Sequence, residues 1–350
     1  MRWNSSRWLP LLTGWLLTGC GEPPPPAGPP AVSFYHWEST LAPDSTARAL
    51  LAPLGDNPLF LRVFDVAWEN GRAYPRAELR IADTTGLPPV VPVVFLTNEV
   101  MERISETELP TLARDVSTTI NQILGSTRRH PEVQFDCDWT AGTRDRYFTF
   151  LSAARDYFST ISATVRLHQY RDRATQGIPP VDRGVLMAYN TGNLDDWATE
   201  NSILDTSIVK SYLRNQPSYP LPLDVAVAVY DWAAVYRRNR LAYLINEPPL
   251  AELADTSFFR PLGINRYEVV RSTYYDGLYL YRGDRLRLEA VSPAEYPRTA
   301  ALVRRYVSGG MGQRLILYRL GSRLWDAAPA VPPPAAESSF PPTLRTGSAH

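Results

Sequence analysis

The chain has 350 residues, with 36 basic and 36 acidic side chains, so its formal net charge is zero at neutral pH. A balanced charge gives no electrostatic reason to expect nucleic acid or an anionic lipid surface as a partner. The 19 Tyr and 9 Trp residues suit a sugar-binding protein, because sugars bind flat aromatic faces, although large barrels also bury many aromatic side chains.

Residues 1–19 have the layout of a signal peptide, with a positive start and an apolar run too short to span a bilayer comfortably. Leu17-Thr18-Gly19-Cys20 resembles a bacterial lipobox, which implies cleavage before Cys20 and lipidation of its sulfur. The alternative is an ordinary secretory signal that happens to contain a Cys. Residues 20–32 form a Pro-rich tether. We therefore expect a lipid-anchored protein of the Gram-negative cell envelope, at the outer membrane or cell surface, which touches the membrane through Cys20 alone.

From residue 31 onward, strand-like runs alternate with helix-like runs, which is typical of a parallel α/β fold. Eight strands are predicted, at 31–37, 58–66, 89–96, 132–138, 162–169, 183–189, 222–230 and 313–319. Five helices are predicted, at 41–54, 105–124, 143–159, 200–214 and 292–308. Together they indicate a single (β/α)8 TIM barrel over residues 33–327. An antiparallel hairpin at 265–290 is expected before the last barrel helix, and residues 328–350, rich in Pro, Ser and Ala, are expected to be disordered.

The run 132–140 alternates apolar and polar residues, and it brings two acids to one face of a strand end. In a barrel wrapped by helices the apolar face points outward, so Asp136 and Asp138 should point inward at the end where such barrels keep their chemistry. Cys137 lies on the apolar face, where it is most simply a small buried hydrophobe. Once Cys20 is lipidated, no second Cys remains for an intramolecular disulfide.

The same run resembles the fourth-strand signature of family-18 glycoside hydrolases, Asp-x-x-Asp-x-Asp-x-Glu. Asp136 and Asp138 match the second and third acids, while Val133 replaces the first acid and Thr140 replaces the catalytic Glu. Met187-Ala188-Tyr189-Asn190 is similar to the Met-x-Tyr-Asp motif of the sixth strand in that family. Over residues 33–320 the chain also resembles a bacterial family of barrel-shaped lipoproteins with an Asp-x-Asp fourth strand, a likeness that implies no activity.

The resemblance implies substrate-assisted hydrolysis, in which Asp138 orients an acetamido group and the Tyr189 hydroxyl helps to hold its oxygen. The general acid should stand at Thr140, whose hydroxyl does not titrate near neutral pH, and losing a general acid costs on the order of 10²–10⁴ in rate. Three acids in loops at the same end of the barrel are candidate replacements, although each is more simply a solvated loop residue: Glu38, Glu99 and Asp231.

Strand parity directs further polar side chains into the barrel. On the fifth strand Arg166 and His168 should face the two acids, and Asn190, Tyr230 and Trp232 should line the same end as substrate-binding residues. Asp136 with Arg166 is equally consistent with a buried structural ion pair. A metal bound by the two acids and His168 is disfavoured, since no paired His spacing supports it, and no cofactor is expected.

Three functions remain open at this point. The first is a surface-anchored, carbohydrate-active barrel with Asp136, Asp138 and Tyr189 in the site. The second is a barrel without catalysis that binds glycan or peptidoglycan, with Trp37, Tyr189 or Trp232 exposed to an open cleft. The third is a structural envelope lipoprotein whose partner is another protein. Fold alone does not decide among them.

Overall fold

The computed structural model describes residues 30–125, 132–307 and 313–327. The predicted signal peptide, most of the predicted tether and the predicted C-terminal tail lie outside these residues. Within the described ranges, no helix combines the length and the apolar character that crossing a bilayer requires.

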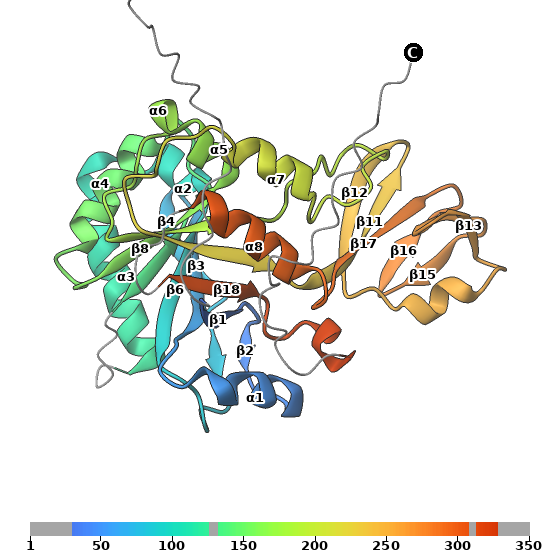
Figure 1. Cartoon of the computed structure of the whole chain (residues 1–350), viewed down its shortest axis with the longest axis horizontal. Helices are drawn as coiled ribbons and strands as arrows, with labels where there is room; N and C mark the ends of the chain where they lie inside the picture. The colour runs from blue at the N-terminus through green and yellow to red at the C-terminus, as the bar shows by residue number, and fades with distance from the viewer. Residues whose placement is uncertain (1–29, 126–131, 308–312, 328–350) are drawn as a thin grey trace, which may run out of the picture.

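Eight parallel strands form a closed barrel, because β1 pairs with β3 on one side and with β18 on the other (Figure 1). In barrel order the strands are β1 (Ala31–His36), β3 (Leu59–Glu69), β6 (Val90–Leu96), β7 (Val133–Asp136), β8 (Ile161–Arg166), β9 (Arg183–Met187), β10 (Leu223–Ala228) and β18 (Arg314–Tyr318). Each lies in a run where the sequence predicts a strand. The predicted (β/α)8 barrel is therefore confirmed.

Helices surround the barrel: α1 (Ser45–Leu51), α2 (Asn98–Arg103), α3 (Leu109–Leu124), α4 (Arg144–Ala154), α5 (Leu167–Arg171), α6 (Arg173–Gln176), α7 (Thr206–Leu213) and α8 (Tyr296–Tyr306). Local sequence explains their starts. The Asp44 side chain caps α1 by accepting a hydrogen bond from the Ala47 N–H. Glu108 bonds back to the Ser105 N–H in a capping box before α3. The buried positions of α3 recur at helical spacing, as an amphipathic helix requires: Leu109, Leu112, Ala113, Val116 and Ile120.

The alternating side chains of the strands divide the apolar core in two. Outside the barrel, Val133, Phe135, Cys137 and Trp139 pack against the surrounding helices, as predicted. Inside it lies a smaller cluster that includes Tyr35, Phe60 and Met187. The outward set of β7 leaves Gln134 and Asp136 inside the barrel, and both are buried. The predicted face of each side chain in this strand is thus confirmed.

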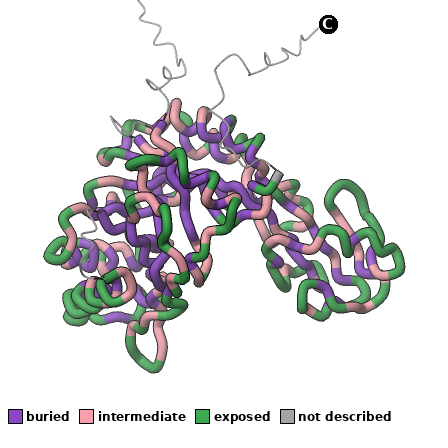
Figure 2. The backbone as a smooth tube through the Cα atoms, turned by 90° about the horizontal axis from the view of Figure 1, so that it is seen from below, coloured by how far each residue is buried: buried purple, intermediate pink, exposed green. Residues whose placement is uncertain are grey.

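Between β10 and α8 the chain leaves the barrel and builds a second, antiparallel sheet. Its strands, in spatial order, are β12 (Arg240–Asn246), β11 (Tyr230–Arg237), β17 (Arg285–Val291), β14 (Arg266–Val269) and β13 (Phe259–Gly263). The same segment also contains a separate two-stranded sheet, the hairpin of β15 (Thr273–Tyr275) and β16 (Leu278–Leu280). We call residues 230–291 the insertion. Figure 2 shows it as a lobe standing out from the barrel, with exposed turns along its outer edge.

The insertion is larger than the predicted hairpin at 265–290, because it starts directly after β10. The apolar run 225–230 contributes to two sheets. The Val229 N–H donates a hydrogen bond to the Tyr318 carbonyl in the barrel, whereas the next residue, Tyr230, pairs with Val291 in the insertion. The β11–β12 turn also lacks Gly. Arg238 and Asn239 adopt positive φ angles of 51° and 64° and form a tight hairpin turn, which the residue pair Arg-Asn does not predict.

Candidate functional site

A cavity of about 450 Å³ opens at the carboxyl ends of the barrel strands. In (β/α)8 barrels this is the end where active sites lie. Strands from all sides of the barrel contribute side chains, and β11 and β12 of the insertion complete the wall. Seven of the predicted site residues line it: Asp136, Asp138, Arg166, Tyr189, Asn190, Tyr230 and Trp232.

Asp136 lies deepest of the two motif acids and is only 4 % exposed. The Thr164 hydroxyl on the neighbouring strand donates a 2.6 Å hydrogen bond to its Oδ1. Burial raises the pKa of Asp136 to about 6; Arg166 opposes the rise and the Asp138 charge adds to it. This carboxyl therefore changes its protonation state near neutral pH, which an ordinary Asp does not.

Asp138 follows β7 and is held by Arg166 at the end of β8. The guanidinium donates from Nε to Oδ1 at 2.5 Å and from Nη2 to Oδ2 at 2.9 Å. Burial disfavours the charged guanidinium, but its hydrogen bonds to Asp138 and the negative charge of that carboxylate outweigh burial and raise the pKa of Arg166. The two side chains form a fixed, two-bond ion pair, and the Asp138 side chain remains 47 % exposed toward the opening.

The Tyr189 hydroxyl is buried and has no hydrogen-bond partner among the described residues. Its ring stacks on Tyr318 at 5.4 Å between centroids, with 19° between the planes. Burial raises the pKa of Tyr189 well above its ordinary value, so the hydroxyl is neutral at any physiological pH. A buried hydroxyl without a partner costs stability, and on a cavity wall it is a group that a ligand can satisfy.

Asn190 and Tyr230 meet across the cavity rim. The Tyr230 hydroxyl donates a 2.5 Å hydrogen bond to Asn190 Oδ1. Asn190 has a φ of 54°, a left-handed conformation that Asn adopts more readily than most residues. The Tyr230 ring in turn contacts Trp232 edge to face at 5.3 Å. These contacts hold three rim side chains in one arrangement.

The placement predicted for His168 is wrong. Strand β8 ends at Arg166 and α5 begins at Leu167, so His168 lies exposed on the first turn of a helix and does not line the cavity. The cause is Gln169, which accepts a 2.7 Å hydrogen bond from the Arg166 N–H and donates to the Trp139 carbonyl. These bonds start a helix where strand alternation alone predicts three more extended residues.

Of the three acids considered as replacements for the missing catalytic Glu, the structure places only Asp231 in the cavity lining. Thr140 is exposed, its N–H and hydroxyl contact Thr143, and it does not line the cavity. Glu99 forms an exposed ion pair on α2, and Glu38 pairs with Arg319 outside the cavity lining. Asp231 does line the cavity, where it is engaged by Arg323.

Several lining residues were not anticipated from the sequence. Asp65 of β3 lines the cavity and accepts two hydrogen bonds from Arg62, one of them 2.7 Å long. Tyr318 continues the inward alternation of β18, while Arg319 lines the cavity from beyond the end of that strand. Asn246 comes from β12, and no sequence signal places that strand beside the barrel.

No cluster of three or more His, Cys, Asp or Glu side chains suited to a metal ion occurs in the described parts of the chain. Cys137 is free and buried, and burial raises the pKa of its thiol well above the ordinary value. It therefore has none of the surroundings that activate a cysteine nucleophile.

No protein-family model matches the chain, and no curated protein matches it significantly. Solved structures do resemble it. A chitinase from Chromobacterium violaceum is 12 % identical, with 85 % of this chain and 97 % of that chain covered and a TM-score of 0.47. The Bacillus cereus spore cortex-lytic enzyme SleL is 16 % identical, with 84 % and 72 % covered and a TM-score of 0.44.

The GH18 chitinase ChiB of Flavobacterium johnsoniae is 13 % identical, with 84 % of this chain and 89 % of that chain covered and a TM-score of 0.43. Because these identities and TM-scores are low, the fold is assigned from the strand pairing, and any function has to be inferred from the residues of the cavity. Family-18 chitinases are thus among the solved structures that this barrel resembles.

Proposed function

We propose that this protein is an envelope-anchored, carbohydrate-active barrel that binds a glycan in the mouth cavity. One observation carries the proposal: the cavity combines aromatic walls with a buried Tyr189 hydroxyl that finds no hydrogen-bond partner within residues 30–125, 132–307 and 313–327. Sugars present apolar C–H faces and a dense set of hydroxyls, so they need both kinds of surface. The predicted lipid anchor at Cys20 would keep this cavity close to the glycans of the cell envelope.

The aromatic walls are held rigidly, which favours binding because little side-chain freedom is lost when a ligand enters. Trp37 contacts Tyr35 at 6.0 Å and Tyr318 at 5.7 Å, both edge to face. Tyr318 is also contacted by Tyr189 and Tyr230. Six aromatic side chains of the lining thus form one connected set of rings, fixed before any ligand arrives: Tyr35, Trp37, Tyr189, Tyr230, Trp232 and Tyr318.

The polar groups of the wall favour recognition of an uncharged ligand. Three carboxylates of the lining each have an arginine partner: Asp65 with Arg62, Asp138 with Arg166, and Asp231 with Arg323. Arg319 is likewise paired with Glu38 and Glu247. Paired groups retain free lone pairs and N–H bonds for sugar hydroxyls, whereas a charged ligand would have to compete with an existing ion pair.

Binding without hydrolysis is the better-supported form of this activity. Hydrolysis by the family-18 route needs a carboxylic acid at position 140, and Thr140 stands there, outside the cavity lining. One observation favours hydrolysis as the second candidate: Asp136 has a pKa of about 6, so it holds a proton in part of the molecules near neutral pH.

The test is the thermal midpoint of the purified protein with chitohexaose, cellohexaose, xylohexaose and soluble peptidoglycan strands. A ligand at a hundredfold its dissociation constant adds about 2.7 kcal/mol of stability. At about 2–4 °C per kcal/mol for somewhat smaller domains, the midpoint should rise by several degrees. The shift should disappear in Asp138→Ala and persist in Asp156→Ala, which removes an exposed aspartate outside the cavity.

Mass spectrometry of the incubated ligand then separates the two candidates. Intact oligosaccharide after prolonged incubation supports a binder, and shortened products support a hydrolase. The absence of a shift with every glycan would contradict the proposal and favour the structural lipoprotein with a protein partner.

A further inference from the structure

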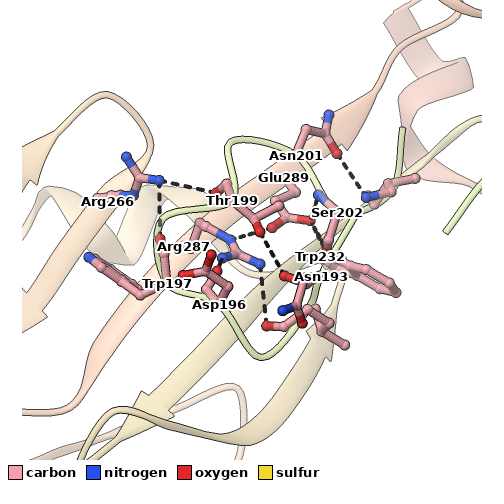
Figure 3. A network of polar contacts seen from close by, with 12 residues as sticks. Asn193, Asp196, Trp197, Thr199, Asn201, Ser202, Trp232, Arg266, Arg287 and Glu289 are labelled. Atoms are coloured by element: carbon pink, nitrogen blue, oxygen red, sulfur yellow. Dashed lines mark hydrogen bonds and ion pairs between the residues drawn. The ribbon is translucent and has the colours of Figure 1, made fainter. Parts of the chain in front are cut away.

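The loop between β9 and α7 is bound to the insertion by two arginines, of which Arg287 is buried and Arg266 is partly exposed. Arg287 of β17 donates to the carbonyls of Asp196 and Leu194, and Arg266 of β14 donates to the Trp197 and Thr199 carbonyls at 3.2 and 3.1 Å. Figure 3 shows these contacts along the loop. A barrel loop and the insertion sheet therefore form one packed unit beside the cavity.

At the centre of this unit lies a buried ion pair between Arg287 and Glu289, whose side chains are 1 % and 0 % exposed. A buried charge is tolerated only where its hydrogen-bonding capacity is filled. Glu289 Oε1 accepts from Arg287, and Oε2 accepts from the Ser202 N–H at 2.8 Å and the Ser202 hydroxyl at 2.5 Å. The third donor to Oε2 is the Trp232 indole, at 2.9 Å (Figure 3).

The bond from Trp232 has a direct effect on the cavity. Indole has a single N–H donor, and here Glu289 accepts it. Trp232 lines the cavity while its N–H is directed into the buried network, so the ring offers a ligand its carbon surface and no hydrogen bond. The same bond fixes the rotation of the ring about its side-chain torsions. Tyr230, two residues earlier, supports the ring from the side.

We propose that Glu289 is a positioning residue that holds Trp232 as a stacking platform for the ligand of the barrel cavity. Arg287 and Ser202 keep the Glu289 carboxylate in place, and the loop ties it to the barrel. The identity of that ligand as a glycan rests on the function proposed above, but the state of the Trp232 ring can be measured without any ligand. The insertion then takes part in recognition from outside the barrel.

The first measurement is the NMR signal of the Trp232 indole N–H in protein labelled with ¹⁵N-tryptophan, assigned by its loss in Trp232→Phe. A charge-assisted hydrogen bond should place this signal downfield and slow its exchange with solvent. In Glu289→Gln the signal should move upfield and exchange at least about tenfold faster, since a bond to a charged group is worth more than about 1.4 kcal/mol, or tenfold. An unchanged signal would overturn the proposal.

Glu289→Asp provides a second variant if Glu289→Gln does not fold. It keeps the charge that Arg287 needs but shortens the side chain by one methylene, so the carboxylate moves away from Trp232 and the same change in signal is expected. Ser202→Ala is the matched control. It removes the hydroxyl donor to the same oxygen but keeps the Ser202 N–H and Arg287, which still hold the carboxylate, so the Trp232 signal should stay hydrogen-bonded.

The second measurement is a double-mutant cycle on chitohexaose affinity by calorimetry. Glu289→Gln should weaken binding about tenfold in the native background and less than about twofold in Trp232→Phe, because its effect passes through the indole. Equal loss in both backgrounds would identify a merely structural role and overturn the proposal. If the native protein does not bind chitohexaose, the glycan proposal loses that ligand, and the indole signal alone decides whether Glu289 positions Trp232.

Discussion

Arg166 donates two hydrogen bonds to Asp138, from Nε at 2.5 Å and from Nη2 at 2.9 Å, across the ends of neighbouring strands. A planar guanidinium matched to a carboxylate in this way specifies orientation as well as charge. The Asp138 oxygens are therefore already directed when a ligand reaches the cavity.

This relationship predicts the effect of Arg166→Lys. Lysine keeps the charge but cannot form both bonds at once, so we expect glycan affinity to fall about tenfold and stability by no more than about 1 kcal/mol. Isothermal calorimetry and urea unfolding measure the two effects. Arg171→Lys is the control, because Arg171 forms a similar two-bond pair with Asp172 on the surface, and affinity should not change there. Unaltered affinity in Arg166→Lys would contradict the role of the pair.

Asp136 predicts an unusual pH dependence of stability. Its pKa is about 6 in the folded protein and about 3.8 when unfolded, so the folded state binds the proton more tightly. Between these values the unfolded state holds fewer protons, so the contribution of Asp136 to the unfolding free energy is full below pH 4 and is lost as pH rises through 6. The amplitude is about 3 kcal/mol, from about 1.36 kcal/mol per pH unit.

Urea unfolding between pH 4 and pH 7 tests this prediction. Relative to Asp136→Asn, the native protein should gain stability on acidification, and Asp156→Asn should follow the native protein. If the native protein instead lost stability relative to Asp136→Asn as pH falls, the assigned direction of the pKa shift would be wrong.

Tyr189→Phe should separate affinity from stability. Removing a buried hydroxyl without a partner relieves a desolvation cost, so the unfolding free energy should stay constant or rise by about 1 kcal/mol. Glycan affinity should fall about 5- to 10-fold, because the ligand loses a hydrogen bond inside the cavity. Tyr219→Phe is a matched control, since the Tyr219 hydroxyl is also buried and unpartnered among the described residues but lies away from the cavity. Affinity losses of similar size in both variants would sink this assignment.

Thr140→Glu tests whether an acid at position 140, where the resemblance expects the catalytic Glu, can reach a bound substrate. Thr140 belongs to the turn that starts α4, and Thr143, which it contacts, also donates a 2.7 Å hydrogen bond to Asn98. A carboxylate at 140 would therefore extend from an exposed turn, and we expect no release of 4-nitrophenol from a chitobioside above the Thr140→Gln level. A gain of about 10² or more, the usual value of a general acid, would show that the position reaches the substrate.

Much of the barrel could be predicted because its signals are local and periodic. In β7 the two faces differ in polarity at every position, so Asp136 and Asp138 could be directed inward and Phe135 and Trp139 outward from the sequence. Parity also placed Arg166 beside them, since neighbouring parallel strands keep their register. Side chains whose direction depends on a regular strand are predictable in this way.

The remaining features depend on contacts between distant segments. Whether residue 168 continues a strand or starts a helix is decided by Gln169, which bonds to a carbonyl 30 residues earlier in the chain. Asp65 faces the cavity because β3 shifts its register between Arg62 and Phe64, an irregularity that simple alternation along the predicted strand does not foresee. The Glu289–Trp232 contact joins residues 57 apart on antiparallel strands of a sheet of which the sequence predicted only a hairpin at 265–290. Tertiary pairings of this kind override local propensity.

The insertion joins the barrel through β11, which is separated from β10 by Val229 alone and supplies Tyr230, Asp231 and Trp232 to the cavity. Strands β13, β15 and β16 supply none of its lining. The rate of sequence change should therefore differ between the two parts of the insertion. The outer half, residues 250–281, can be lengthened, shortened or exchanged between related proteins at little cost to ligand selectivity. The two root strands, β11 and β17, must be inherited together with the barrel.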